Sequence, residues 1–194
     1  MKWVVAAIVA FVVLYTAVNY FYRKPGPGYR PYQDAQDRAT TARLLNAGWQ
    51  KIPVELRRPV EKPDTGHATA PVTRAAAGLG PELEGKFAER PKLPASIDRV
   101  VAPTTVTRGS SYGAYFTATL SDQRLQAGEL TLYRHGNELV FVPESESLPG
   151  AELRSRWPDD TYWVGFATTG LPAGRYEARI VAKGPAAAWS FEIR

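Results

Sequence analysis

The sequence predicts a mainly β protein with a single N-terminal transmembrane helix, a proline-rich linker and a C-terminal antiparallel β-sandwich of about seven strands. Three observations support this: a 20-residue run without charge near the N-terminus, 10 prolines between residues 23 and 96, and alternation of apolar with polar residues from residue 97 onward. The expected boundaries are 1–24 for the membrane anchor, 25–96 for the linker and 97–194 for the sandwich.

The uncharged run extends from residue 3 to residue 22. At about 1.5 Å per residue, a helix of this length crosses a hydrocarbon core about 30 Å thick. Residues suited to the membrane interface lie at both ends of the run: Trp3, Tyr20, Tyr22, Arg23 and Lys24. A cleaved signal peptide is the alternative, but it would have a shorter apolar region that ends in small residues. We therefore expect an uncleaved, single-pass anchor with the lipid bilayer as its partner.

The orientation of this anchor depends on two opposing signals. Only Lys2 precedes the apolar run, whereas Arg23, Lys24 and Arg30 lie after it, and the positive-inside rule would keep that side in the cytoplasm. A two-residue tail before a long apolar run is instead the layout of a signal-anchor that exports the C-terminal part of the chain. We expect the exported orientation, with the C-terminal domain in the periplasm or outside the cell.

The formal charge of +5 is concentrated in the linker. Residues 23–96 carry 13 Lys and Arg against 8 Asp and Glu, whereas residues 97–194 carry 10 against 11. Nucleic acid is therefore not an expected partner, because binding it requires a concentrated basic patch on a folded domain. The chain has no cysteine, which excludes disulfides, thiolate metal sites and thiol nucleophiles.

The linker contains one predicted helix, at residues 34–47. Asp34 is suited to cap its N-terminus, and Gly48 lies directly after it, where a helix-terminating glycine is common. Residues 49–63 alternate around prolines, which favours an extended edge segment. Residues 64–96 are rich in Ala, Pro, Gly and Glu, and this composition predicts disorder.

The alternation in the C-terminal half predicts a first strand at residues 100–106 and a hairpin around residues 135–137. Further strands are expected around Phe116, Tyr162, Tyr176 and Trp189. The segment Leu171-Pro172-Ala173-Gly174-Arg175-Tyr176 resembles the tyrosine corner of fibronectin type III and related immunoglobulin-like modules. The resemblance covers residues 97–194 at the level of the fold. It implies an immunoglobulin-like sandwich with a buried tyrosine and implies no particular function.

Residues that carry chemistry are few. The only histidines are His67, in the segment expected to be disordered, and His135, expected in a hairpin turn, so no metal site, cofactor or enzyme activity is expected. The GSSYG sequence at 109–113 matches Gly-x-Ser-x-Gly, but a strand is predicted after it instead of the helix that a nucleophile elbow requires. Acidic residues in two expected loops leave calcium as a weaker alternative: Glu144, Glu146, Asp159 and Asp160.

Aromatic residues between positions 157 and 163 form the candidate partner-binding face: Trp157, Tyr162 and Trp163. Core or rim positions are the alternative for such tryptophans. The function that we expect is that of a non-enzymatic accessory module docking on a membrane complex or envelope protein. The alternatives are an assembly factor for a membrane enzyme, such as a respiratory oxidase, and a carbohydrate-binding envelope module.

Overall fold

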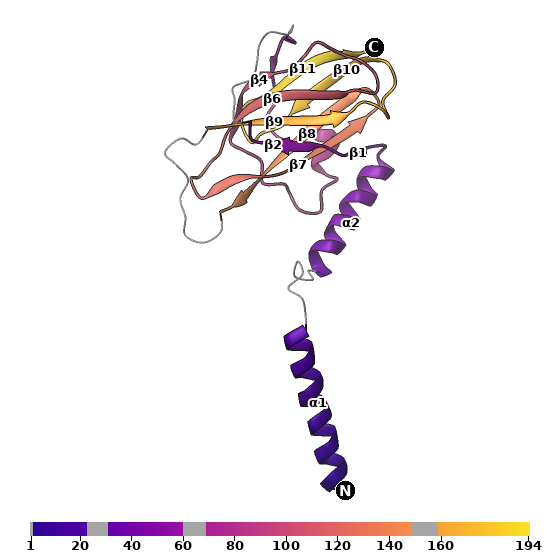
Figure 1. Cartoon of the computed structure of the whole chain (residues 1–194). Coiled ribbons are helices and arrows are strands. Elements are labelled where there is room, and N and C mark those ends of the chain that lie inside the picture. Colours follow the sequence, from indigo (N-terminus) through magenta and orange to yellow (C-terminus); the bar gives the residue numbers. More distant parts are fainter. Residues whose placement is uncertain (1, 23–30, 60–68, 149–158) are drawn as a thin grey trace. The chain divides into compact units, whose positions relative to one another are not determined.

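The computed structural model describes residues 2–22, 31–59, 69–148 and 159–194 (Figure 1). The chain divides into two compact units, Met1–Ala35 and Gln36–Arg194. The described residues form mainly β-structure, with an apolar helix near the N-terminus and two β-sheets in the second unit. The coarse fold class that the sequence predicts is confirmed.

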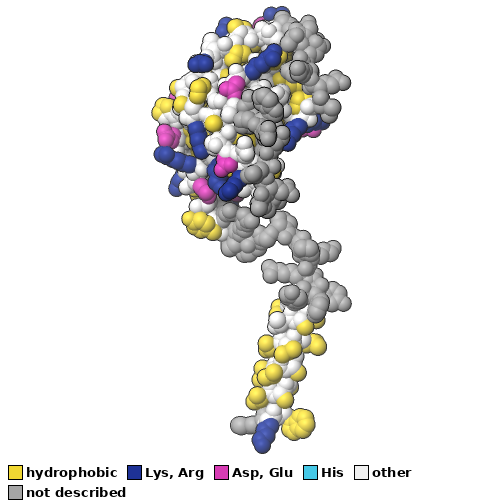
Figure 2. Space-filling model, turned by 90° about the vertical axis from the view of Figure 1, so that its left-hand side faces the viewer, with side chains coloured by type: hydrophobic (Ala, Val, Ile, Leu, Met, Phe, Trp, Pro, Cys, Tyr) yellow, Lys and Arg dark blue, Asp and Glu magenta, His cyan; other side chains and the backbone are white. Residues whose placement is uncertain are grey.

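Helix α1 (Lys2–Tyr22) has hydrophobic side chains over its surface (Figure 2). The side chains of Thr16 and Asn19 bond within the helix: Thr16 Oγ1 donates to the Val12 carbonyl at 2.8 Å, and Asn19 Nδ2 donates to the Tyr15 carbonyl at 3.0 Å. Such internal bonds satisfy polar groups that lipid cannot. Helix α1 is long and apolar enough to cross a membrane.

Helix α2 (Pro31–Asn46) begins three residues earlier than predicted, because proline is well suited to the first helical position. Asp34, expected as the N-cap, therefore lies in the first turn. Gly48 lies just after the helix with φ +82°, and the Trp49 N–H donates to the Leu44 carbonyl at 2.9 Å. This is a Schellman-type end, and the glycine predicted to terminate the helix is confirmed.

The second unit contains a four-stranded and a seven-stranded sheet (Figure 1). The four-stranded sheet has the order β2 (Glu55–Arg57), β9 (Asp159–Ala167), β6 (Ser111–Thr119) and β4 (Ser96–Val101). The main path of the seven-stranded sheet is β1 (Gln50–Ile52), β7 (Leu125–His135), β8 (Glu138–Ser147), β10 (Gly174–Ile180), β11 (Ala186–Ile193) and β3 (Thr73–Ala75). Strand β5 (Thr105–Val106) also pairs with β11.

The predicted hairpin is confirmed as β7 and β8, which pair antiparallel, with Gly136 at φ +59° in their short connection. The first predicted strand is instead divided into β4 and β5, which belong to different sheets. Pro103 lies between them and has no N–H with which to continue a ladder. The remaining predicted strands are present as β6, β9, β10 and β11.

The expectation that all strands pair antiparallel is wrong. Strand β10 pairs with β8 in parallel, from Glu177↔Glu138 to Ile180↔Phe141, and β5 is parallel to β11. The chain passes through β9 of the other sheet between β8 and β10, and this long crossover lets both strands run in the same direction.

Buried residues of both sheets belong to one apolar cluster. In it, the rings of Tyr112 and Phe191 stack at 4.0 Å between centroids, and Trp189 Nε1 donates to the Tyr112 hydroxyl at 2.9 Å. The Tyr112 hydroxyl donates to the Pro103 carbonyl at 3.2 Å. Burial raises the pKa of Tyr112 above its ordinary value, and this hydroxyl therefore stays protonated.

Tyr176 belongs to this cluster and is fully buried. Its hydroxyl donates a hydrogen bond of 2.9 Å to the backbone carbonyl of Pro172. The burial expected from the Leu171–Tyr176 segment is therefore present, and the hydroxyl bond to Pro172 fixes the turn before β10.

The outer face of the seven-stranded sheet carries a second apolar cluster. The sheet contributes Tyr133, Val140 and Val142, and Val181 lies directly after β10. These side chains are covered by residues from the N-terminal half of the chain: Leu44, Trp49, Leu79, Leu83 and Leu93. We call this surface the covered face.

The expectation that residues 64–96 are disordered is wrong for residues 69–96, while residues 64–68 lie outside the described residues. The segment forms β3 and the short helix α3 (Pro81–Glu84), whose Leu83 is fully buried. The Ala88 N–H donates to Thr40 Oγ1 of α2 at 2.9 Å. The physical reason is the covered face itself, because its apolar side chains would otherwise remain in water.

Candidate functional site

Trp163 lies on the outer face of the four-stranded sheet, in β9. Its ring rests over two glycines that face each other across β6 and β9, Gly113 and Gly165. A Cβ atom added at Gly165 would lie 2.2 Å from the ring, and one at Gly113 would lie 2.7 Å from it. Because neither glycine has a side chain, the indole can lie against the backbone at a place that a larger residue would occupy. We call Gly113 and Gly165 the glycine seat.

The guanidinium of Arg57, in the neighbouring strand β2, lies 5.5 Å from the centroid of the Trp163 ring. This is within the range of a cation–π interaction. Arg57 Nε also donates to Glu55 Oε1 at 2.7 Å. The indole therefore lies against the backbone of the two glycines and close to an exposed arginine that forms an ion pair with Glu55.

Polar, mostly uncharged side chains surround Trp163 on the same sheet. Tyr115 is its directly paired neighbour in β6, and the hydroxyls of Thr117 and Thr161 lie 3.1 Å apart across the two strands. We call this surface the Trp163 face, formed by Arg57, Ser111, Tyr115, Thr117, Thr161 and Trp163. Among the described residues, no helix or strand packs over this face as α2 and α3 pack over the covered face.

An open hollow of about 310 Å³ borders the Trp163 face. Its lining comes from β2, β6 and β9 and from the residues just before β2: Pro53, Val54, Glu55, Ser111, Gly165, Phe166 and Ala167. A shallow, mixed polar and apolar depression of this kind suits a side chain presented by a partner more than an enclosed small molecule.

The gap between the two sheets is much smaller. It has a volume of about 10 Å³ and is lined by residues that include Phe116, Pro143 and Ser145. That volume holds about one water molecule. Ser145 Oγ is buried and has no hydrogen-bond partner among the described residues, so a water at this position is its natural partner.

The residues predicted for the partner-binding face have different positions in the structure. Trp163 lies on an outer face, whereas Tyr162 is 2 % exposed and its ring packs 5.5 Å from that of Phe116 in the core. Tyr162 is therefore wrong as a surface residue, because neighbouring residues in a strand point to opposite faces. Trp157 lies outside the described residues.

The predicted membrane-interface residues belong to α1 or to the residues after it. Trp3 is 88 % exposed near the start of the helix. Tyr20 and Tyr22 lie in its last turn, and their side chains are not described; Arg23 and Lys24 lie outside the described residues.

The other sequence motifs lie in strands. Ser111 of the GSSYG segment begins β6, so a strand comes after it as predicted. Glu144 and Glu146 lie within β8 and not in a loop, which removes the loop geometry behind the calcium alternative. Asp159 and Asp160 begin β9, and their side chains are not described.

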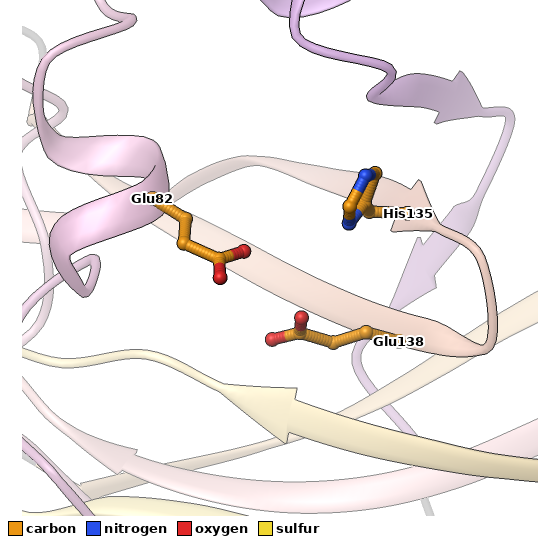
Figure 3. A group of neighbouring side chains, drawn as sticks. All are labelled: Glu82, His135 and Glu138. Atoms are coloured by element: carbon orange, nitrogen blue, oxygen red, sulfur yellow. The ribbon is translucent and has the colours of Figure 1, made fainter.

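A group of potential metal ligands appears where the sequence indicates only a turn. His135 ends β7, Glu138 begins β8, and Glu82 lies in α3; one ligand atom of each lies within 4.8 Å of the others (Figure 3). His135 and Glu138 are close in the sequence, and a hairpin register pairs them. Glu82 is more than 50 residues away, and no local signal indicates that it joins them.

Comparisons of the chain with protein-family models, with curated proteins and with solved structures gave no match.

Proposed function

We propose that this protein is a non-enzymatic accessory module that is anchored in a membrane by α1 and binds a membrane or envelope protein through its Trp163 face. The observation that carries the proposal is the Trp163 ring itself, seated on Gly113 and Gly165 and flanked by Arg57. Tryptophan, tyrosine and arginine are the residues that contribute most binding energy in protein interfaces.

The Trp163 face has the composition of an interface. Tyr115 and Trp163 present large, partly exposed rings, and the threonines and Ser111 beside them supply hydrogen-bonding groups without a charge to desolvate. Little conformational entropy is lost on binding, because the glycine seat already fixes the indole.

Arg57 favours a protein partner over a carbohydrate. One face of the Trp163 ring lies against the glycine backbone, and Arg57 approaches the ring as well. A sugar that stacks on the indole would have to displace the guanidinium, whereas a carboxylate on a protein partner would pair with it. The carbohydrate-binding alternative predicts instead that the protein is retained on an immobilised glycan.

We further propose that the second unit is an immunoglobulin-like β-sandwich. The shared cluster of both sheets and the buried Tyr176 with its bond to Pro172 support this proposal. The parallel β8–β10 pair is a departure from a purely antiparallel arrangement. In this proposal, α1 is an uncleaved single-pass anchor, and the sandwich is exported.

Photo-crosslinking in native membranes tests the binding role. A photoreactive amino acid at Thr161, on the Trp163 face, is expected to capture a specific membrane or envelope protein. The same amino acid at Val72, which is 39 % exposed and lies outside this face, is the matched control. Capture at Thr161 should decrease strongly when Trp163 is replaced by alanine. Equal capture from both positions would contradict the proposal, and a captured membrane enzyme would favour the assembly-factor alternative.

Cysteine labelling tests the orientation. Because the chain has no cysteine, Ser110→Cys introduces a single thiol at an exposed position before β6. We expect an impermeant maleimide to label this variant in intact cells. Labelling only after lysis would place the second unit in the cytoplasm and contradict the exported orientation.

Alkaline extraction tests the anchor. Because burial of about 20 apolar residues in lipid does not depend on charge, the full chain should stay with the membrane at high pH and at high salt. Release by salt alone would contradict the anchor, and a shortened mature N-terminus would show that the helix is cleaved as a signal peptide.

A further inference from the structure

Three side chains with metal-binding atoms converge at one edge of the covered face (Figure 3). Glu82 and His135 are exposed and Glu138 is half-buried, so an ion in solution can reach all three. They come from three elements of the same compact unit: α3, the end of β7 and the start of β8.

The backbone that carries these side chains is fixed by buried neighbours. His135 and Glu138 are directly paired across the β7–β8 hairpin, and Leu139, next to Glu138, is fully buried. Glu82 lies next to Leu83, which is also fully buried. The three side chains therefore start from positions that the packing of the unit determines.

The imidazole of His135 is also oriented. Its ring centroid lies 5.1 Å from that of Trp49, and it lies so close to Gly48 that a Cβ there would be 3.3 Å from the ring. Trp49 is itself buried in the cluster of the covered face. A histidine placed by packing on one side offers its nitrogen to a ligand with less loss of entropy than a freely rotating side chain.

Charge also favours a cation. The two carboxylates have one basic neighbour among the ion pairs of the described residues, Arg179, whose Nη2 lies 3.8 Å from Glu138 Oε1. The same nitrogen donates to the Leu79 carbonyl at 3.1 Å, so Arg179 is shared between two acceptors. This leaves Glu82 and most of the negative charge of the group for an added ion.

We propose that Glu82, His135 and Glu138 bind a divalent first-row transition metal ion, for which Zn²⁺ is the appropriate probe. One imidazole nitrogen and two carboxylate oxygens suit zinc, whereas calcium and magnesium prefer oxygen ligands alone. Zinc bonds to these atoms are about 2.0–2.2 Å long, and side-chain rotation of the exposed Glu82 and the half-buried Glu138 would bring their oxygens to that distance. Three protein ligands leave a coordination position for water or for a side chain of a partner.

Metal binding would connect α3 to the β7–β8 hairpin. Because α3 forms part of the cover and the hairpin belongs to the sheet beneath it, the ion would hold the cover in place. The bound ion should therefore raise the melting temperature of the protein, since a ligand that binds only the folded state stabilises it.

Titration of the full chain in detergent micelles with Zn²⁺ tests the proposal, by calorimetry and by the absorption of Co²⁺ in the same site. We expect one saturable site and a higher melting temperature in Zn²⁺, with no competition from Ca²⁺ or Mg²⁺. His135→Ala and Glu82→Gln should each lower the affinity at least about tenfold, a loss comparable to that seen on removing even outer-shell partners of metal ligands.

Two control variants test whether side chains outside the proposed site contribute to metal binding. Glu84→Gln changes an exposed carboxylate in the same helix that pairs with Arg90 at 3.0 Å, and His67→Ala removes the other histidine of the chain. Both variants should keep the affinity of the full chain. Absence of saturable binding, binding unchanged by His135→Ala, or loss of binding in either control would each overturn the proposal.

Discussion

The two outer sheet faces of the second unit differ in what lies over them. On the seven-stranded sheet, Tyr133, Val140 and Val142 point outward and are buried under leucines and a tryptophan from the N-terminal half of the chain. On the four-stranded sheet, threonines, Tyr115 and Trp163 point outward, and none of the described helices packs over them. The apolar face removes its large side chains from water by packing against other segments of the chain, whereas the polar Trp163 face is compatible with contact with water among the described residues.

Removal of the cover should have the largest effect. A chain that begins at Ile97 lacks five buried side chains of the covered face, whose burial contributes roughly 8–15 kcal/mol at 1.5–3 kcal/mol each. That amount is comparable with the whole stability of a domain, about 5–15 kcal/mol. We therefore expect this chain to aggregate or to melt without cooperativity.

A chain that begins at Gln36 keeps the cover and is the matched control. It should be soluble and should unfold in one cooperative transition, as measured by circular dichroism. Equal solubility and melting temperature of the two chains would show that the cover contributes little.

A single leucine of the cover should have the next largest effect. Leu44 is 3 % exposed and Leu45, its neighbour in α2, is 58 % exposed. Leu44→Ala should lower the free energy of unfolding by about 2–5 kcal/mol because it leaves a cavity. Leu45→Ala should change it by less than about 0.5 kcal/mol. Similar results for both variants in urea denaturation would contradict the packing of α2 on the sheet.

On the Trp163 face, Gly165→Ala should have a smaller effect on stability and a clear effect on binding. The added methyl group would meet the Trp163 ring and push it from its seat. The ring is only half-buried and can move outward, so we expect a cost of about 1–3 kcal/mol, as for overpacked sites.

Gly165→Ala should also decrease the capture of a partner by the photoreactive amino acid at Thr161. Gly170→Ala is the control, because no atom lies within 4 Å of the added methyl group. Undiminished capture in Gly165→Ala would show that the seated position of the indole is not used in binding.

Tyr133 gives the smallest expected effect, confined to alkaline solution. Burial, followed by the charges of Glu144 and Glu129, raises the pKa of Tyr133 from 10.0 to about 12. Because the pKa is higher in the folded state, this stabilisation is complete below about pH 10 and is lost as the pH rises towards about 12. Tyr133→Phe should therefore flatten the decline of melting temperature in this range.

Burial of Tyr112 raises the pKa of that residue in the same direction, so part of the alkaline decline should remain in Tyr133→Phe. Tyr115→Phe, on the Trp163 face, is the control for the loss of a tyrosine hydroxyl. An unchanged pH profile in Tyr133→Phe would indicate that its hydroxyl is in contact with water.

Much of the fold can be predicted from local patterns. Gly48 indicates the end of α2, and alternation on both sides of a glycine turn indicates the β7–β8 hairpin. The candidate site can be predicted only in part. An aromatic residue in a strand points to Trp163, but the same reasoning places Tyr162 beside it on one face, although alternate residues of a strand point in opposite directions.

Predictions from composition fail where a segment depends on a distant partner. Residues 69–96 have few large apolar side chains and many prolines, which resembles a disordered linker. Their leucines at 79, 83 and 93 nevertheless suffice to cover a sheet face that already exists. A segment of this kind is ordered by the surface it meets, and that surface lies 40 or more residues further along the chain.

The sequence by itself determined α1, the strands β6 to β11 and the turn between β7 and β8, because each depends on hydrophobicity and glycine or proline within a few consecutive residues. The tertiary structure alone decided which sheet face is covered, that Trp163 lies flat on Gly113 and Gly165, and that Glu82 meets His135 and Glu138. The physical reason is that these contacts depend on the order in which strands pair and on which face each strand buries. The order of strands in a sheet and the choice of which sheet face is buried depend on the whole chain, and a local pattern of residues does not specify them.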